Sequence, residues 1–376
     1  MHHRPTFATI DLNALADNYV SAADHLGADI AIMCVVKADA YGHGAIRCAE
    51  RLSEAGAAWM AVAIPEEGIE LRKAGIKSRI LCMDGFWRGQ EDTLFEYDLT
   101  PVVFREEQLR ILQNEAKLRR KPIKIHVKID SGMGRVGIRY NNIGTFASLL
   151  KASDQLIPEA AMTHFAAADD PHSNWFTALQ VERFELSVKE IRDAGISFEF
   201  TDLCNSPAAF GFPEARKNMV RLGGVIYGLK DDVLPPSISA PILKPVMSLS
   251  TSISHIKKLA AGATVGYGLT HTLTRPSVVA TLPAGYADGI PRSLSNSGCV
   301  IVRGRRAPII GRVSMDWTIV DVTDIPEAEF GDTAFFIGGS LDQDHISAEE
   351  LACVAGTISY EVTCGISPRV PRIFVS

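Results

Sequence analysis

The chain has 376 residues, 47% of them hydrophobic and 22% charged, and a formal net charge of -6. This length exceeds what one hydrophobic core usually supports, so we expect two domains. The acidic balance argues against a nucleic-acid-binding protein, for which a basic surface is expected, and favours a small-molecule partner. Charges interrupt the apolar runs before they reach the roughly 18 residues that a membrane-spanning helix needs.

Seven cysteines are scattered along the chain without a CxxC pair or the spacing of a zinc site. Their odd number, in a chain that has no apolar leader, predicts reduced thiols and a cytoplasmic protein. Asp169, Asp170 and His172 lie close together in the sequence. We interpret them as part of a solvated loop and predict no metal site.

From residue 31 to residue 222, short apolar runs alternate with amphipathic stretches, a pattern typical of a parallel α/β fold. The predicted strands are 31–37, 59–63, 79–82, 99–104, 123–129, 157–164, 198–204 and 219–222. The helical patterns between them include 45–55, 66–74, 106–118, 142–151 and 178–194. Eight strand-helix units favour a (β/α)8 barrel over an open doubly wound sheet, which usually has five or six strands.

The texture of the sequence changes near residue 235, where four prolines occur within eleven residues and indicate a domain boundary. Short β-branched runs at 246–256, 277–283, 300–302, 317–322 and 333–337 predict an antiparallel β domain. Residues 8–12 read as a strand without a barrel partner. We therefore predict a barrel over 13–234 and a β domain formed by 1–12 and 235–376, in which the two ends of the chain meet.

A barrel enzyme carries its chemistry at the carboxyl ends of the strands. Polar side chains occur at the predicted ends, among them Lys37, Tyr41, Lys128, Asp130, Arg135, Thr163, His164, Asn205, Ser206 and Arg221. Gly223 and Gly224 follow the last strand, where small residues let backbone N–H groups approach an anion. This position predicts a phosphate site.

Lys37 follows the apolar run 32–36 and precedes the sequence Ala-Asp-Ala-Tyr-Gly-His-Gly. A lysine whose stem packs against a buried strand is held in place and suited to forming a Schiff base. A lysine at the end of a strand is also commonly a solvated surface residue. The whole run 35–44, however, is similar to the cofactor-lysine motif of the alanine racemase family.

The resemblance to alanine racemases extends over essentially the whole chain. Its motifs are Val-Val-Lys-Ala-Asp-Ala-Tyr-Gly-His-Gly (35–44), Lys-Ile-Asp-Ser-Gly-Met-Gly-Arg-Val-Gly (128–137), Thr-His-Phe-Ala (163–166), Val-Gly-Tyr-Gly (265–268), Gly-Tyr-Ala-Asp-Gly (285–289), Gly-Arg-Val-Ser-Met-Asp (311–316) and Tyr-Glu-Val (360–362). They occur in the order of the family. Gly224 departs from the family, because a bulkier apolar residue is expected there.

The resemblance implies pyridoxal 5'-phosphate (PLP) as cofactor, bound covalently by Lys37, with Tyr267 as the second catalytic base. It places Tyr41, Ser206, Gly223, Gly224 and Tyr360 at the phosphate, with Asn205 beside them, and Arg221 at the pyridine nitrogen. His164 would connect Arg221 to Tyr267, and Arg135 would contact the cofactor and the substrate carboxylate. Met315, Asp316 and Tyr286 would line the substrate site, and Lys128 is a candidate for carbamylation.

Racemisation explains why two bases are needed. Removing the α-proton of an amino acid leaves a carbanion that requires an electron sink. Bases on opposite faces allow one to remove the proton and the other to return it. Because Tyr267 lies in the predicted β domain and Lys37 in the barrel, the resemblance implies a head-to-tail homodimer with shared sites, although folding back within one chain stays open.

The expected activity is the interconversion of L- and D-alanine in the cytoplasm, supplying D-alanine for peptidoglycan. A racemase of serine, lysine or several amino acids is the closest alternative. A non-catalytic PLP-binding barrel protein would lack the β domain, and a decarboxylase of the same fold type would lack the Ala-Tyr-Gly-His-Gly continuation.

Overall fold

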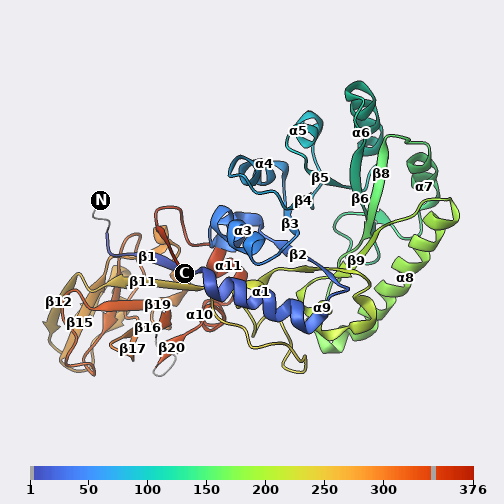
Figure 1. Cartoon of the computed structure of the whole chain (residues 1–376). Helices are drawn as coiled ribbons and strands as arrows, with labels where there is room; N and C mark the ends of the chain where they lie inside the picture. Colours follow the sequence, from blue (N-terminus) through green and yellow to red (C-terminus); the bar gives the residue numbers. More distant parts are fainter. Residues whose placement is uncertain (1–3, 340–343) are drawn as a thin grey trace.

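The computed structural model of the chain describes residues 4–339 and 344–376. Strands β2 to β10 with their helices form one half of the molecule, and the strands from β11 onward form the other (Figure 1). Strand β1, near the start of the chain, and strand β21, near its end, both lie in the second half (Figure 1). In the described part of the chain, no helix combines the length and apolar character that crossing a membrane requires.

The first half is a closed barrel of eight parallel strands, as predicted. Its strands are β2 (Ala31–Val35), β3 (Trp59–Val62), β4 (Arg79–Cys82), β5 (Thr100–Val103), β6 (Ile123–Asp130), β8 (Leu156–Met162), β9 (Phe200–Cys204) and β10 (Met219–Leu222). They pair in the order β5-β4-β3-β2-β10-β9-β8-β6, and a β5–β6 pairing closes the ring. A two-residue strand, β7 (Ile138–Arg139), pairs in parallel with the end of β6 and was not predicted.

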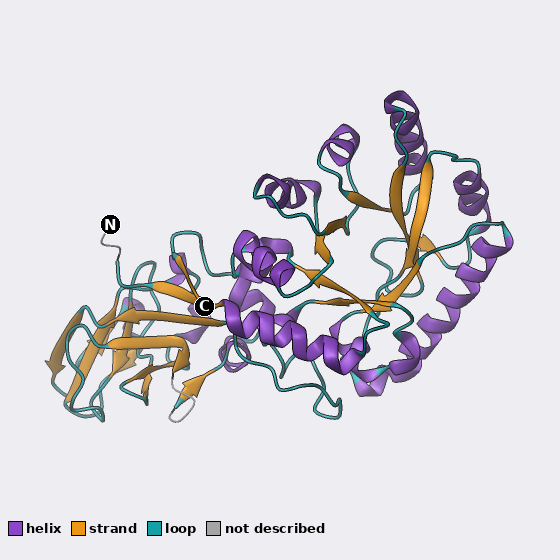
Figure 2. Ribbon diagram, viewed as in Figure 1, coloured by secondary structure: helices purple, strands orange, loops and turns teal. Residues whose placement is uncertain are grey.

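Helices surround the barrel on its outer side (Figure 2). They are α1 (Leu12–Leu26), α2 (Lys37–Gly42), α3 (Ala45–Glu54), α4 (Pro65–Lys73), α5 (Glu91–Glu96), α6 (Glu106–Arg119), α7 (Gly144–Lys151), α8 (Asn174–Asp193) and α9 (Ser206–Gly211). The five predicted helical patterns correspond to α3, α4, α6, α7 and α8. Helix α1 was not among them, although Asp11 caps it by accepting a hydrogen bond from the Ala14 N–H at 2.9 Å.

The second half consists mainly of antiparallel strands. One sheet contains β17 (Arg305–Pro308), β16 (Cys299–Val302), β19 (Thr333–Gly339), β11 (Met247–Ser252), β1 (Phe7–Asp11) and β21 (Arg372–Val375), with β20 (His345–Ile346) beside β19. Smaller sheets contain β12 (His255–Leu259), β15 (Ser277–Leu282) and β18 (Thr318–Asp321), and β13 (Thr264–Val265) with β14 (His271–Thr272). The predicted run 246–256 therefore spans parts of two strands in different sheets.

The two ends of the chain are neighbours in the large sheet. Strand β1 pairs antiparallel with β11 on one side and parallel with β21 on the other. The expectation that the chain ends meet is confirmed. Helices α10 (Ala348–Ala355) and α11 (Ser359–Cys364) were not predicted, and α11 packs against α2 at the barrel.

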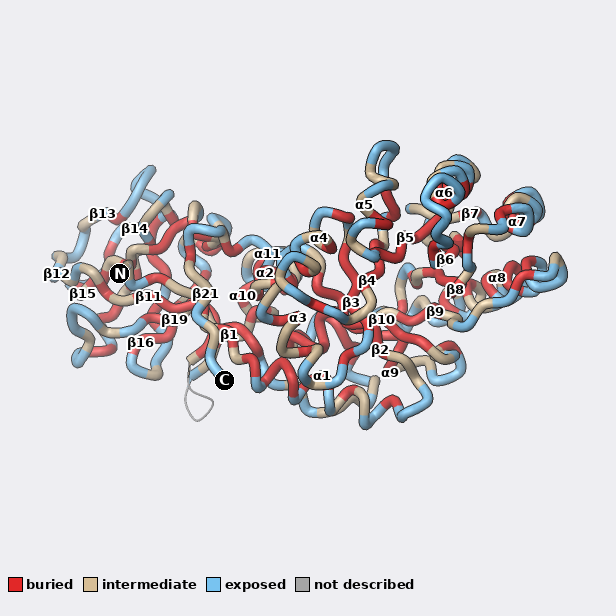
Figure 3. The backbone as a smooth tube through the Cα atoms, turned by 45° about the horizontal axis from the view of Figure 1, so that its top comes forward, coloured by how far each residue is buried: buried red, intermediate tan, exposed pale blue. Residues whose placement is uncertain are grey.

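Buried backbone continues from the β domain into the barrel (Figure 3), and one hydrophobic core contains residues of both halves. At the junction, Arg372 donates a hydrogen bond to the carbonyl oxygen of Gly42 at 3.0 Å. Gly42 has a φ of 82°, and a Cβ atom there would collide with the carbonyl oxygen of Thr363 in α11. This close approach brings α11 to the loop that carries Lys37.

We expect Gly42→Ala to lower the free energy of unfolding by about 2–4 kcal/mol, because it combines left-handed strain with a collision against backbone. Gly27→Ala is the matched control, since Gly27 has a φ of 92° but no atom within 4 Å of its Cβ position. We expect the control to lose about 1 kcal/mol. Denaturant unfolding of both variants measures the difference, and equal losses would contradict the packing argument.

Candidate active site

Lys37 is half-buried and begins α2, a single left-handed turn after β2 that we call the left-handed loop. The next four residues, Ala38 to Tyr41, all have φ between 52° and 54°, which is the left-handed region. Such a conformation costs L-residues roughly 1–2 kcal/mol each. A run of four persists only if surrounding contacts hold it.

Side chains on both sides hold this left-handed loop. Glu67 accepts hydrogen bonds from the Ala38 and Ala63 N–H groups, both at 2.7 Å, and so joins the loops after β2 and β3. Nδ1 of His43 lies 2.9 Å from the Ala40 carbonyl oxygen. Because a carbonyl oxygen can only accept, Nδ1 carries the proton. Burial lowers the pKa of His43 to about 4, so its ring is neutral.

Five predicted phosphate-site residues meet beside this loop. The Gly223 N–H donates to Ser206 Oγ at 3.0 Å, and a Cβ on Gly223 would lie 2.8 Å from the Tyr41 hydroxyl oxygen. The rings of Tyr41 and Tyr360 have centroids 5.2 Å apart. Burial raises the pKa of Tyr360 to about 12 and also raises that of Tyr41. Both phenols are therefore neutral donors, as a phosphate requires.

Gly224, which departs from the family pattern, lies under one of these phenols. A Cβ atom at Gly224 would be 2.5 Å from the hydroxyl oxygen of Tyr360. A bulkier residue therefore does not fit while Tyr360 keeps this position. Asn205 caps α9 by accepting a weak hydrogen bond from the Ala208 N–H at 3.4 Å, so its side chain positions the helix that begins with Ser206.

A second cluster lies deeper, around the buried Arg221 on β10. Its Nη2 donates to the Thr163 carbonyl oxygen at 2.8 Å and lies 3.3 Å from Nδ1 of His164. Because a guanidinium has no acceptor, Nδ1 of His164 accepts and its Nε2 carries the proton. Burial first, and then the charges of Arg221 and Lys128, lower the pKa of His164 far below its usual value. The ring is neutral.

Asp202 on β9 completes this cluster and was not among the predicted site residues. It is fully buried and forms an ion pair with Nη1 of Arg221. Burial raises its pKa, and the charge of Arg221 acts against that rise. The sequence does contain a signal for Asp202, because this carboxylate lies inside a run that predicts a buried strand. A buried charge usually requires a partner of opposite charge.

Lys128 lies on β6 and is also buried. Burial, followed by the repulsion of Arg221, lowers its pKa to about 7. A substantial fraction of the amine is therefore uncharged near neutral pH. Lys124 lies on the same strand but is exposed and pairs with Glu159 at 2.7 Å.

The loop after β6 is fixed by Asp130, whose Oδ1 accepts from the Gly132 and Gly134 N–H groups at 3.0 and 2.9 Å. Arg139 donates to its other oxygen at 2.9 Å. Arg135 extends from this loop and is exposed. Its charge contributes to the low pKa of His164, as does that of Lys37, so both cations lie within electrostatic reach of the deep cluster.

The remaining predicted residues lie in the β domain. Tyr267 begins the turn Tyr267–Leu269 and is 73% exposed. With Arg312 and Trp317 it lines a cavity of about 600 Å³. Tyr286 and Met315 are also exposed. Among the described residues, no hydrogen bond joins the side chain of Tyr267, Tyr286 or Met315 to Lys37 or to the phosphate-site residues.

Ion pairs position the turn that carries Tyr286. The Tyr286 N–H donates to the Ser314 carbonyl oxygen at 3.0 Å, next to Met315. Asp288, fully buried at the end of the turn, pairs with Arg4 and with Arg369. Arg369 also donates to Asp316 at 2.6 Å. Sequence reasoning missed these arginines, because their partners lie far away along the chain.

The fold and this site define a class of protein. A lysine stands at the carboxyl end of a barrel strand, and neutral hydroxyls gather with the backbone N–H of Gly223 in the same part of the barrel. Such a site suits a cofactor whose aldehyde can react with the lysine amine and whose phosphate can accept hydrogen bonds from the hydroxyl and N–H groups. The chain has the architecture of a PLP-dependent barrel enzyme with an additional β domain.

Comparisons with known proteins identify the family. Residues 10–231 match the alanine racemase N-terminal domain, and residues 246–374 match the alanine racemase C-terminal domain. The chain is 44% identical to an alanine racemase from Halothermothrix orenii, over 98% of this chain and 96% of that protein. It is 40% identical to one from Geobacter sulfurreducens, over 100% and 98%. The chain belongs to the alanine racemase family, as its motifs predicted.

Solved structures agree over the full length. The alanine racemase from Streptomyces lavendulae matches with a TM-score of 0.91 at 34% identity, covering 100% of this chain and 98% of that one. The enzyme from Bartonella henselae, which has covalently bound pyridoxal phosphate, matches with a TM-score of 0.89 at 28% identity, covering 99% of both chains.

We expect Asp202→Asn to lower the free energy of unfolding by about 3 kcal/mol, because it leaves the buried Arg221 without its counter-ion. Asp193→Asn is the control: Asp193 pairs with Lys189 on the exposed face of α8, where a pair contributes less than about 1 kcal/mol. Urea unfolding at pH 7 compares the two. A loss as small as that of the control would show that Asp202 is protonated and does not compensate Arg221.

Proposed function

We propose that this protein interconverts L- and D-alanine with PLP as cofactor. The observation that carries the proposal is the convergence of Lys37, the phosphate-site residues and the Arg221–His164 pair in a chain that matches alanine racemases over its full length. Racemisation of serine, lysine or several amino acids is the alternative, because side-chain specificity depends on small changes of pocket volume.

The residues present fit the cofactor. Lys37 would form the covalent bond to its aldehyde carbon, and Tyr41, Ser206, Gly223, Gly224 and Tyr360 would bind its phosphate. Arg221 would donate to the ring nitrogen. When bound, the cofactor withdraws electrons from the α-carbon of the amino acid and so makes its proton removable.

We assign the two bases to Lys37 and Tyr267, on opposite faces of the substrate. A free phenol has a pKa of about 10, so a tyrosine needs help to act as a base at neutral pH. Arg221 is permanently charged and already occupies Nδ1 of His164. The N–H at Nε2 of His164 is then left to donate to the oxygen of Tyr267, which favours the ionised form of that oxygen.

The substrate carboxylate would be bound by Arg135 and by backbone N–H groups of the segment with Met315 and Asp316, with Tyr286 closing the pocket. Arg369 holds Asp316 and, through Asp288, the turn that carries Tyr286. A bidentate arginine fixes a carboxylate in orientation as well as in position. One base would then face the α-proton, and the other base would face the opposite side of the α-carbon.

We also propose a homodimer in which Tyr267, Tyr286, Met315 and Asp316 of one subunit complete the barrel site of the other. In support, the exposed apolar side chains of the β domain include Tyr267, Leu269, Tyr286, Met315 and Trp317. Exposed apolar groups of this size usually mark an interface. A two-fold pairing would complete two equivalent sites at once.

The domain division is proposed at the predicted boundaries, with a barrel over 13–234 and a β domain formed by 1–12 and 235–376. The pairing of β1 with β11 and β21 and the two family matches support it. We place the protein in the cytoplasm, where it would supply D-alanine for peptidoglycan. All seven cysteines are free thiols, which agrees with a reducing compartment.

The proposal is tested by incubating the PLP-loaded protein with L-alanine, L-serine or L-lysine and measuring D-enantiomers by chiral chromatography. D-alanine should form fastest, and Lys37→Ala should lose at least about 1,000-fold in rate because it lacks both a base and the cofactor bond. Lys73→Ala, on the exposed side of α4, is the matched control and should keep full activity.

Faster formation of D-serine or D-lysine would keep the mechanism and replace the substrate. Cofactor binding without any racemisation would reject the function, and release of carbon dioxide would indicate a decarboxylase.

Mixing two inactive variants tests the shared site. Lys37→Ala and Tyr267→Phe each damage one half of every site in a homodimer. In a mixed dimer, one site contains both defects and the other contains none. Random exchange should therefore restore about a quarter of the wild-type activity, since half of the dimers are mixed and each has one intact site of two. The absence of recovery after confirmed subunit exchange would place both bases within one chain.

Lys128 is the proposed site of carbamylation. Its pKa of about 7 means that the neutral amine, which reacts with carbon dioxide, increases as the pH rises through 7. With 13C-bicarbonate we expect a carbamate signal by NMR that is stronger at pH 8 than at pH 6 and absent in Lys128→Ala. Lys124→Ala, on the same strand, should keep it. A signal that survives in Lys128→Ala would assign the modification elsewhere.

A further inference from the structure

A second cavity lies at the opposite end of the barrel from Lys37. It has a volume of about 310 Å³ and is lined at the amino ends of three neighbouring strands by Arg79 on β4, Thr100 on β5 and Lys124 on β6. The catalytic groups of a barrel enzyme lie at the carboxyl ends of the strands. This cavity is therefore separate from the site described above.

The lining of this cavity is strongly cationic. Its charged members are Arg72, Lys77, Arg79, Lys121 and Lys124, with Asp98 as the acidic one. The chain as a whole has a net charge of -6. A local excess of positive charge in an acidic protein is not explained by average composition, and it creates a potential that attracts anions.

The carboxylates near the cavity neutralise these cations only in part. Arg79 and Lys124 share the buried carboxylate of Glu159, and Asp98 and Glu199 also act on Arg79. Arg79 is packed 3.9 Å above the ring of Trp59, so its position is fixed. The five cations of the lining still outnumber these carboxylates.

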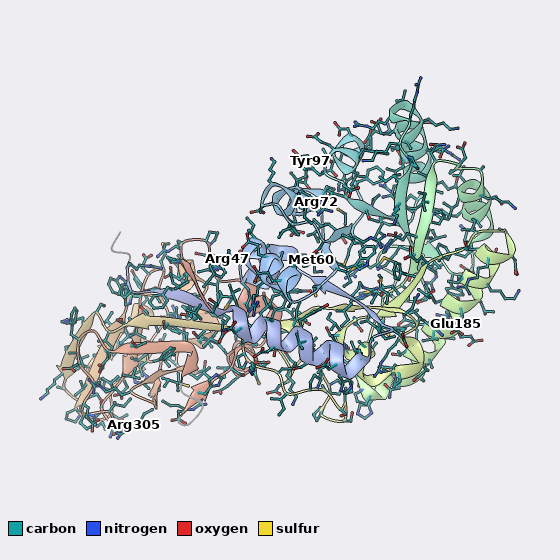
Figure 4. All side chains as sticks on the ribbon, viewed as in Figure 1. Arg47, Met60, Arg72, Tyr97, Glu185 and Arg305 are labelled. Atoms are coloured by element: carbon teal, nitrogen blue, oxygen red, sulfur yellow. The ribbon has the colours of Figure 1, made fainter. Side chains whose placement is uncertain are left out.

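Arg72 is a fixed cation with main-chain partners. It donates to the carbonyl oxygens of Tyr97 at 2.9 Å, of Ile76 and Ser78 at 2.7 Å each, and of Asp98 at 3.0 Å. Arg72 and Tyr97 lie close together beside α4 and α5 (Figure 4). Four of its five N–H groups are used in this way. Arg72 therefore contributes charge to the cavity but cannot bind a ligand through two N–H groups at once.

The flexible donors are lysines. The Lys121 ammonium contacts the Phe95 carbonyl oxygen at 3.3 Å, which leaves two of its N–H groups for a ligand. Lys77 is exposed on the other side of the cavity. Lysines bind phosphate oxygens as point charges with rotatable donors, so these side chains can adapt to a polyanion.

We propose that this cavity is a binding site for a phosphate-bearing polyanion, held by Lys77, Lys121 and Lys124 over the fixed charges of Arg72 and Arg79. The volume is at the lower end of the range for small-molecule sites and accommodates a pyrophosphate group with a small substituent. The ligand is separate from the PLP phosphate, and the proposal does not depend on the reaction at Lys37.

The test uses the PLP-loaded protein, so that the cofactor phosphate site is already filled. Inorganic pyrophosphate and ATP are titrated by calorimetry at low and moderate salt. The test variant is Lys77→Gln with Lys121→Gln. The control is Lys189→Gln with Lys258→Gln, which changes the net charge equally at residues that do not line the cavity. Alanine racemisation is measured for each protein to show that the fold is intact.

We expect saturable binding with one site per chain, weakened at least about tenfold in the test variant and unchanged in the control, since charge-assisted hydrogen bonds to two ammonium groups are lost. Equal affinity for the two probes would identify the phosphates as the recognised group, and tighter binding of ATP would identify a nucleotide. The absence of saturable binding, equal weakening in the control, or competition with alanine would overturn the proposal.

Discussion

The left-handed loop from Ala38 to Tyr41 is the constraint around which the site is organised. Four successive L-residues in this conformation are unstable by themselves, so the loop depends on contacts such as those of Glu67 and His43. Lys37 and Tyr41 lie at the two ends of this loop. Under the proposed function, covalent attachment and phosphate binding would both depend on one strained turn.

The deep cluster shows how the protein keeps its histidine neutral among cations. His164 lies beside Arg221, which is always charged, and Lys128 and Arg135 add to the field. Asp202 supplies the negative charge on the far side of Arg221. Because its pKa is lowered, His164 stays neutral while it accepts a hydrogen bond from Arg221 and donates one to another partner. His164 therefore stands between the permanent charge of Arg221 and that partner.

The barrel strands could be predicted from the sequence, because buried parallel strands leave continuous apolar runs. The phosphate-site residues were predicted from family motifs, each of which lies within a short segment. Asp202, Arg4 and Arg369 could not be predicted, because each acts on a partner brought near only by the fold. The split of run 246–256 into β11 and β12 depends on a change of sheet that short β-branched sequences do not reveal.

The position of Tyr267 relative to Lys37 is another property that no pattern along the chain contains. A tyrosine that is 73% exposed is a surface residue by every local measure. Its assignment as a base rests on the family motif and on the need for a second proton donor and acceptor. In the proposed dimer, shape complementarity between two copies would meet that need, and complementarity is a property of surfaces rather than of segments.

The pairing of β1 with β21 has a consequence for how the protein is made. Arg4, near the start of the chain, and Arg369, near its end, both pair with Asp288 beneath the turn of Tyr286. Strand β1 is made long before β21, so it can pair with β11 first and with β21 only after residues 372–375 have been made. The two arginines that support the substrate-side turn therefore come together late, when segments from distant parts of the chain have joined one sheet.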